Sequence, residues 1–336
     1  MFAQDIVLDT WQIVTGILTH PNQRLHVGYL LSSALIALYL LHHNQDLSRG
    51  KTLLSKKLWW SASARLDYKL IVFNSFFKAL LLGQFTVLGI TISNAVGQLL
   101  RETFGPSPTV LSAATAIMGF TVSMTLLNDL CVYLLHRMMH SVPLLWSFHR
   151  IHHSATTMTP LTLLRLHPIE LLLNNFRGAL IFGLLAGGFG HLADHKVSEM
   201  TFLGANLFSF AFFAFGANLR HSHIRFGYWQ PLERLLISPL QHQIHHSISA
   251  AHHNRNFGSK LAIWDFFFGT LMTSKNVSML QFGLPKDNEH RQTLCAALLS
   301  PFKDEIDEVP LISLSDTNRS FALTASISMS NDADCE

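Results

Sequence analysis

Long apolar runs separated by short polar segments dominate the first two thirds of the chain. Runs at 25–41, 79–100, 110–127, 178–190 and 202–219 contain no Asp, Glu, Lys or Arg. A bilayer core of about 30 Å requires about 20 apolar residues in a helix, so 79–100 and 110–127 predict two spans. The run at 25–41 is just long enough, and the last two runs predict either two spans or a helical hairpin. The pattern predicts an all-α integral membrane protein with about four to five membrane helices or hairpins.

Lys and Arg are distributed unevenly between these runs, which sets the expected orientation. The loop at 42–78 is basic, as are 136–169 and the chain after 220, whereas the loop after the second span offers only Arg101. Under the positive-inside rule, the N-terminus is outside and the three basic regions are cytoplasmic. The stretch around Trp59, Trp60 and Tyr68, which is rich in aromatic residues and lysines, predicts an interfacial helix. We therefore expect a cytoplasmic helical cap on the membrane helices.

Composition supports a membrane protein and excludes several other classes. Only 13% of residues are charged and mean hydropathy is +0.28, whereas soluble domains have about 25% charged residues. A net charge of +3 without a long basic block gives no reason to expect nucleic acid as a partner. The three cysteines are far apart and form neither a disulfide framework nor a zinc ribbon. The unusual feature is the count of 20 histidines against 21 acidic residues.

Three short motifs concentrate these histidines. One is HxxxH at 136–140, and the other two are HxxHH at 149–153 and 242–246. Residues at i, i+3 and i+4 share one face of a helix, so each motif presents two or three imidazoles to a common point. Neutral imidazole binds iron, zinc and copper, and eight such ligands are too many for one ion and about right for two. A single HxxxH would mean little, but three motifs on the same expected membrane side predict a di-metal site.

Other polar residues are candidates to complete or support this site. His221 and His223 follow the last apolar run and are further candidate ligands. His167 is also a candidate ligand, although a supporting or structural role is the preferred interpretation. Asp129 lies seven residues before His136, on the same helix face. We expect it to accept a hydrogen bond from the non-ligating nitrogen of a histidine ring. The alternative is an interfacial acid that reaches water.

A longer pattern connects the histidine motifs and continues beyond them. Its positions are Asp129, Tyr133, His136, Arg137, His140, His149, His152, His153, His167, Glu170, His221, His242, His245, His246, Asn256, Phe257, Gly258, Trp264, Asp265, Gly269 and Thr270. This pattern resembles the fatty acid hydroxylase/sterol desaturase superfamily over about residues 110–275. The resemblance implies a non-haem di-iron centre, with O2 and two electrons as co-substrates and a lipid as substrate.

Carried over position by position, the resemblance also implies individual roles. The metal ligands would be His136, His140, His149, His152, His153, His221, His242, His245 and His246. Asp129, Glu170 and Asp265 would support them. Sphingolipid acyl hydroxylases of the family have one more ligand, at a position that is Arg225 here. Either His223 substitutes for it or one metal has an open position.

The resemblance suggests three parts of the chain. Residues 1–109 would hold N-terminal membrane helices and the interfacial helix, 110–275 the di-iron domain, and 276–336 a C-terminal extension that is disordered after about 306. No His-Pro-Gly-Gly haem loop is present, so electrons would come from a separate cytochrome b5-like protein, ferredoxin or reductase. No dilysine signal ends the chain, so a bacterial inner membrane fits at least as well as the endoplasmic reticulum.

The chemistry and position of the motifs favour an enzyme over other classes. Cleaving an unactivated C–H bond requires a metal-bound oxidant that no side chain supplies, which leads us to expect lipid hydroxylation or desaturation. The alternatives are a histidine-rich membrane metal transporter or metal-binding protein, and an inactive scaffold. Transporters hold ligands near the bilayer midplane, whereas these motifs lie at span ends. Zinc could replace iron in an aerobic preparation.

The phenylalanine-rich run at 208–215 has two interpretations. It either lines an entry for the substrate or packs internally.

Overall fold

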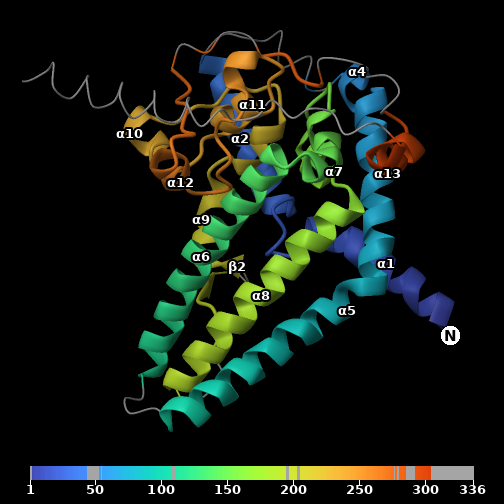
Figure 1. Ribbon diagram of the computed structural model, residues 1–336. Coiled ribbons are helices and arrows are strands. Elements are labelled where there is room, and N and C mark those ends of the chain that lie inside the picture. The colour runs from blue at the N-terminus through green and yellow to red at the C-terminus, as the bar shows by residue number, and fades with distance from the viewer. Residues whose placement is uncertain are drawn as a thin grey trace, which may run out of the picture.

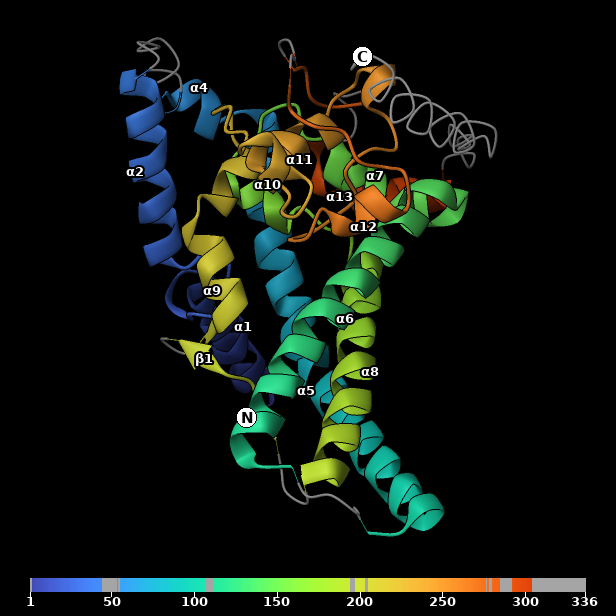
Figure 2. The same ribbon diagram turned by 90° about the vertical axis from the view of Figure 1, so that its left-hand side faces the viewer.

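Three long helices run together and carry a cap of short helices at one end (Figures 1 and 2). The computed structural model describes residues 2–43, 53, 55–106, 111–193, 197–202, 205–275, 277, 280–284 and 292–303. The long helices are α5 (Ala62–Phe104), α6 (Ala113–Ser141) and α8 (Pro168–Ala193). Beside them lie α1 (Phe2–Thr19), α2 (Val27–His43) and α4 (Lys56–Trp59).

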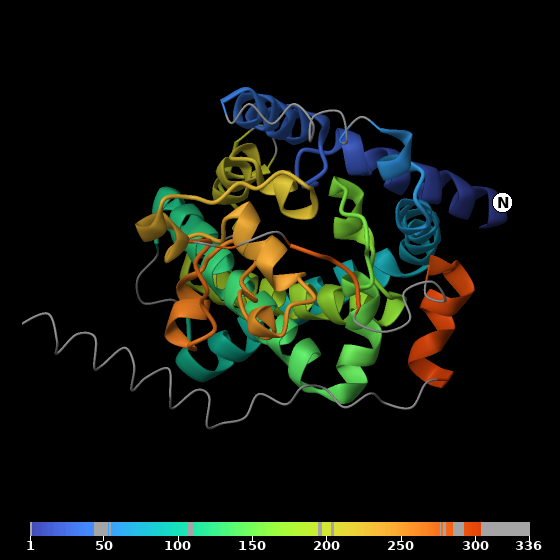
Figure 3. The same ribbon diagram turned by 90° about the horizontal axis from the view of Figure 1, so that it is seen from above.

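The cap is built from short elements that connect or follow the long helices. Seen from above, the blue N-terminal helices and the red α13 lie at its rim (Figure 3). Its elements are α7 (Pro143–His153), η1 (Pro160–Leu164), η2 (Ala217–His221), α10 (Gln230–Glu233), α11 (Pro239–His245), η3 (Ala250–His252), α12 (Ile263–Phe267) and α13 (Leu294–Lys303). Below it lie α9 (Leu207–Ala214) and an antiparallel pair of two-residue strands, β1 (Thr201–Phe202) and β2 (Ala205–Asn206).

The described residues contain two helices, α6 and α8, that are long and apolar enough to cross a membrane. The two halves of α5, Ala62–Leu81 and Gly83–Phe104, meet at 48° and would add a third span if they cross together. The helical fold class is therefore confirmed. The expected count of four to five spans is not reached by these criteria.

Two apolar runs differ from their expected form. The run at 178–190 is part of a 26-residue helix that begins at Pro168, so it is longer than its apolar core suggests. The run at 202–219 forms no single helix, because α9 has eight residues and ends before Gly216, whose φ is +78°. Eight helical residues rise only about 12 Å, much less than a bilayer core.

The expected loop and tail also need correction or comment. Residues 62–78, expected within a cytoplasmic loop, form the first part of α5. The interfacial helix is reduced to the four-residue α4, followed directly by that long helix. The expected disordered segment after 306 lies outside the described residues.

Glycines allow α5 and α8 to approach closely. A Cβ atom added at Gly183 would lie 2.6 Å from the Cβ of Ile92, and one at Gly187 would lie 2.6 Å from the carbonyl oxygen of Ser93. Small residues spaced four apart let helix backbones pack tightly in membranes. This packing holds α8 at the angle from which its first turn reaches the cap.

Candidate metal centre

The end of α6 and the whole of α7 position the first two histidine motifs. α6 continues beyond its apolar part and carries His136 and His140 one turn apart. Pro143 occupies the first turn of α7, where the missing N–H costs no helical hydrogen bond. The chain therefore turns directly from one helix into the next, and the α7 motif faces the end of α6.

α11 carries the third motif and is capped at both ends by its own sequence. The Ser238 side chain accepts from the Gln241 N–H, and the Gln241 side chain accepts from the Ser238 N–H. This reciprocal capping box fixes where the helix begins. His242 and His245 lie within α11, and His246 is its C-terminal capping residue.

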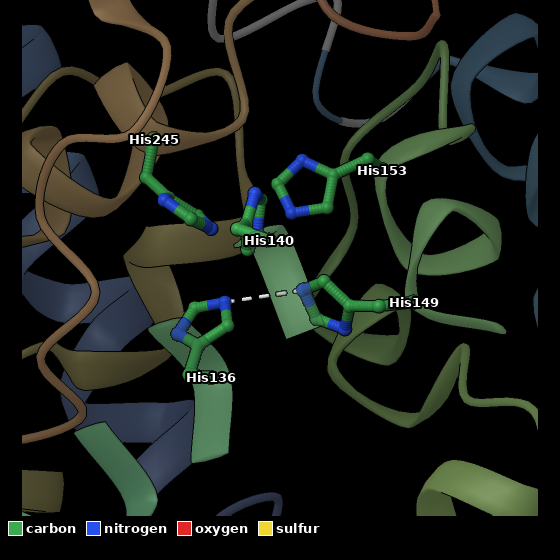
Figure 4. A group of neighbouring side chains, drawn as sticks. All are labelled: His136, His140, His149, His153 and His245. Atoms are coloured by element: carbon green, nitrogen blue, oxygen red, sulfur yellow. Dashed lines mark hydrogen bonds between the residues drawn. The ribbon is translucent and has the colours of Figure 1, made fainter. Parts of the chain in front are cut away.

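These elements bring together all nine histidines that the family resemblance marks as ligands. Within each of two groups, the ring nitrogens that could bind a metal lie within 4.8 Å of one another. Figure 4 shows the rings of the first group converging on a common centre. The first group is His136, His140, His149, His153 and His245; the second is His152, His221, His242 and His246.

Each HxxHH motif divides its histidines between the two groups. In α7, His149 and His153 belong to the first group and His152 to the second. In α11 the division is reversed, because His245 joins the first group and the residues at 242 and 246 join the second. The groups are adjacent, since the ring centroids of His153 and His246 are 4.5 Å apart. The two motifs therefore connect both groups.

Hydrogen bonds fix the orientation of three rings in the first group. The Nδ1 atoms of His136 and His245 lie 2.8 Å from the carbonyl oxygens of Phe257 and Arg255, respectively. Nδ1 of His149 lies 3.0 Å from Oε1 of Glu170. Because carbonyl oxygens only accept, Nδ1 of His136 and His245 carries the proton and Nε2 keeps a lone pair for a metal. An ionised Glu170 would orient His149 in the same way.

The spacing of the ring nitrogens fits metal ions. His136 Nε2 lies 3.1 Å from His149 Nε2, and His221 Nε2 lies 3.1 Å from His242 Nε2. Nitrogen ligands at about 2.0–2.1 Å from one ion are separated by roughly 2.8–3.0 Å in octahedral geometry and about 3.3–3.4 Å in tetrahedral geometry. The observed separations lie between these two ranges.

Unpaired nitrogens in the first group point to the same conclusion. Nε2 of His140, His153 and His245 is buried and has no hydrogen-bond partner among the described residues. Leaving a buried polar atom without a partner costs about 1–3 kcal/mol. A bound metal ion would remove this penalty at all three atoms.

Burial keeps the cap histidines in the form that binds metals. It lowers the pKa of His149 and His152 to about 3. A neutral imidazole is the ligand form, so no proton must be displaced near pH 7. Burial, with a smaller contribution from neighbouring histidines, also lowers the pKa well below its ordinary value at His153, His221, His242, His245 and His246.

Asp129 does not contact a histidine, so that expectation was wrong. Its carboxylate accepts hydrogen bonds from the backbone N–H groups of Lys260 and Leu261, both at 3.0 Å, and from Trp264 Nε1 at 3.1 Å. Seven helical residues rise about 10.5 Å, which places Asp129 too far from the ring of His136. Asp129 instead attaches the segment before α12 to α6.

Asp265 supports the site through the backbone. Its carboxylate accepts from the N–H groups of Phe257 and Gly258, both at 2.8 Å, and from Thr270 Oγ1 at 2.6 Å. The carbonyl of Phe257 in turn accepts from His136. The Asn256-Phe257-Gly258 motif thus orients the ring of a candidate ligand through the backbone carbonyl of Phe257, which no side-chain pattern reveals.

Two further candidates lie outside both groups. His223 accepts a long hydrogen bond, 3.4 Å, from the N–H of Met158 through Nε2. His167 accepts from the N–H of Ile169 at 3.1 Å, and its Nε2 lies 3.2 Å from the carbonyl oxygen of Leu298. His167 therefore caps the start of α8, in agreement with a structural role. Neither His167 nor His223 belongs to the second group, which has four histidines among the described residues.

A buried ion pair that the sequence did not reveal holds α7 in place. Arg165 and Asp67 are both fully buried and form an ion pair at 2.9 Å. Arg165 also donates to the carbonyl of Ile151 and to the hydroxyl of Ser154, both at 2.9 Å. These contacts fix the C-terminal end of α7, where His152 and His153 lie, against α5.

The phenylalanine-rich run packs internally at several positions. It forms α9, and the Arg220 guanidinium lies 4.6 Å from the ring centroid of Phe212. Phe210 and Phe213 make edge-to-face contacts with Tyr29. These contacts support the packing interpretation and leave a substrate entry untested.

Comparison with known proteins agrees with the motif pattern. Residues 121–270 match the family model for fatty acid hydroxylase. The chain is 29% identical over 170 residues to a Rhizobium tropici protein named ornithine lipid hydroxylase OlsE, an alignment that covers 50% of this chain and 46% of that protein. The chain thus spans about half the length of this curated relative, and no solved structure matches. The match of residues 121–270 to the fatty acid hydroxylase model and the similarity to this relative both support the resemblance to the fatty acid hydroxylase/sterol desaturase superfamily.

Proposed function

We propose that this protein is a membrane-bound, O2-dependent oxygenase that hydroxylates a lipid at a centre of two irons. The observation that carries the proposal is the pair of adjacent histidine groups, nine imidazoles with their candidate ligand atoms within 4.8 Å inside each group. The fatty acid hydroxylase domain supports lipid hydroxylation. Desaturation requires the same kind of oxidant, but no observation favours it.

Iron in these two groups would supply the capacity to activate O2 and oxidise an unactivated C–H bond. The chain itself contributes orientation and an apolar environment. Acceptors on Nδ1 of His136, His149 and His245 direct Nε2 toward the centre. Eight of the nine histidines are buried, which limits the access of water. Limited water access reduces side reactions of an oxidant.

The relative's name suggests which lipid to test first. That protein is named an ornithine lipid hydroxylase, so ornithine lipid is our first candidate substrate for this chain. A separate electron donor and a cytoplasmic position of the cap complete the proposal. The cap lies at one end of the long helices (Figure 2), within reach of a soluble donor.

The first experiment combines metal analysis with product analysis. The full chain would be produced with iron-57 in cells that contain ornithine lipid and purified without oxygen. We expect two irons per chain by elemental analysis and Mössbauer spectroscopy, and ornithine lipid with one added oxygen that carries the label from 18O2. His152→Ala combined with His245→Ala removes one ligand from each group and should abolish both signals.

Controls separate these outcomes from poor folding. His42→Ala removes an exposed histidine at the end of α2 and should leave iron content and product unchanged. Stable zinc with little iron after an iron-replete anaerobic preparation, together with no oxidised lipid, would refute the oxygenase and favour a metal-handling protein. Two irons with no labelled ornithine lipid would refute only the choice of substrate.

A further inference from the structure

A cleft of about 510 Å³ lies between α5 and α8, at the end of these helices away from the histidine groups. Figures 1 and 2 show the two helices side by side as they approach the start of α6. The described residues that line the cleft include Ile90, Asn94, Gly97 and Arg101 of α5 and Phe182, Ala186 and His191 of α8. No described residue of the lining is acidic.

The outer end of the cleft presents polar groups without partners. A Cβ added at Gly97 would lie 3.5 Å from Nη1 of Arg101, so the guanidinium folds back along α5 into the space that this glycine leaves. The neighbouring Glu102 accepts from Gln98 instead. The side chains of Arg101 and His191 make no ion pair or hydrogen bond with a described residue, and His191 is only 8% exposed. A guanidinium with free donors in a cleft without acids suits an anionic group, above all a phosphate.

The inner end of the same cleft is apolar. Ile90 and Phe182 lie there with exposed fractions of 51% and 39%. Ile90, Asn94, Gly97 and Arg101 follow the i, i+4, i+7, i+11 spacing of one helix face. Eleven helical residues rise about 16 Å, so the lining changes from apolar to cationic along much of one membrane leaflet.

We propose that this cleft binds an anionic phospholipid in the leaflet away from the histidine groups. The phosphate lies between Arg101 and His191, and an acyl chain lies along Ile90 and Phe182. A free phosphate ion would use only the polar end and would leave the apolar end empty. Binding connects α5 to α8 beside the contact of Gly187 with α5, and therefore stabilises the packing of the two helices.

The test measures lipid binding to the full chain by native mass spectrometry in detergent. Phosphatidylglycerol is the main probe, with diacylglycerol of the same acyl chains and inorganic phosphate as comparison probes. We expect one tightly bound phosphatidylglycerol per chain and about tenfold weaker binding to Arg101→Gln, because a hydrogen bond to a charged group is lost. Arg101→Lys should retain most of the affinity, since it retains the charge.

Two further variants keep the test decisive. Arg65→Gln removes the same charge from an exposed position at the opposite end of α5 and should bind phosphatidylglycerol like the wild type. Ala186→Phe fills the apolar part of the cleft without a change in charge and should also weaken binding. Unchanged binding to both Arg101→Gln and Ala186→Phe would overturn the proposal. Equal binding of diacylglycerol, or displacement of the lipid by inorganic phosphate, would overturn it as well.

Discussion

At the scale of single residues, the most direct side-chain contact to a candidate metal ligand is the hydrogen bond between His149 and Glu170. Glu170 is buried, and its second oxygen, Oε2, has no hydrogen-bond partner among the described residues. Carboxylates in this position fix the tautomer of a ligating histidine and raise its basicity. Sequence similarity pointed to Glu170, and the structure supplies its partner.

Substitution of Glu170 should lower metal affinity. We expect Glu170→Ala to reduce iron affinity or activity by about 10–100-fold, and Glu170→Gln to reduce it less because the amide oxygen can still accept. Iron per chain after dialysis against a graded chelator series measures the effect. Glu102→Gln, an exposed substitution at the far end of α5, is the matched control. Wild-type iron retention by Glu170→Ala would show that the His149 contact does not support a metal.

At the scale of secondary-structure elements, the position of α7 depends on contacts distant in sequence. The ion pair of Arg165 with Asp67 joins the segment after η1 to the first turns of α5. Ile151 and Ser154 at the end of α7 accept hydrogen bonds from the same guanidinium. A helix of 11 residues is marginal by itself in water, so these contacts and its packing determine its position.

Loss of one partner of this pair should be strongly destabilising. Asp67→Ala leaves the Arg165 guanidinium buried without its anion, and we expect the free energy of unfolding to fall by about 3–5 kcal/mol. Thermal unfolding in detergent, with iron retention measured in parallel, checks this result. The double variant Asp67→Leu with Arg165→Met should recover part of the loss, because no buried charge remains. If the double variant were as unstable as the sum of the two single variants, the pair would contribute no coupling.

At the scale of the whole molecule, the close packing of α5 against α8 supports the cap. Gly187 lies in that crossing, whereas a Cβ added at the adjacent Gly188 would meet no atom within 4 Å. The two neighbouring glycines therefore offer a direct comparison within one helix.

Alanine at these two positions should have opposite effects. Gly187→Ala places a methyl group 2.6 Å from the carbonyl oxygen of Ser93, and we expect a loss of about 1–3 kcal/mol from overpacking. Gly188→Ala should be neutral or slightly stabilising, because alanine favours helix more than glycine does. Thermal unfolding of both variants in the same detergent is the measurement. Equal stability of the two variants would mean that α5 and α8 do not pack this closely at Gly187.

Sequence alone determined the features that depend on local spacing. The i, i+3, i+4 histidines had to share helix faces, and apolar runs without charge had to form helices in a lipid environment. These rules were sufficient to expect a helical membrane protein with clustered imidazoles, and the family pattern named the nine residues that the structure gathers. The same rules predicted the extent of two helices wrongly. The run at 202–219 contains only the eight-residue α9, which ends before Gly216, and the run at 178–190 is part of a longer helix.

Only the tertiary structure decided which residues meet across long separations. The division of each HxxHH motif between two groups follows from the placement of α7 opposite α11, which no periodicity encodes. The carbonyls of Phe257 and Arg255 became ring acceptors because Asp265 and the chain around it fold over α6. Backbone oxygens carry no sequence signal, and contacts between distant segments depend on how the helices pack. The sequence therefore indicated the candidate ligands, while the fold determined how they are arranged.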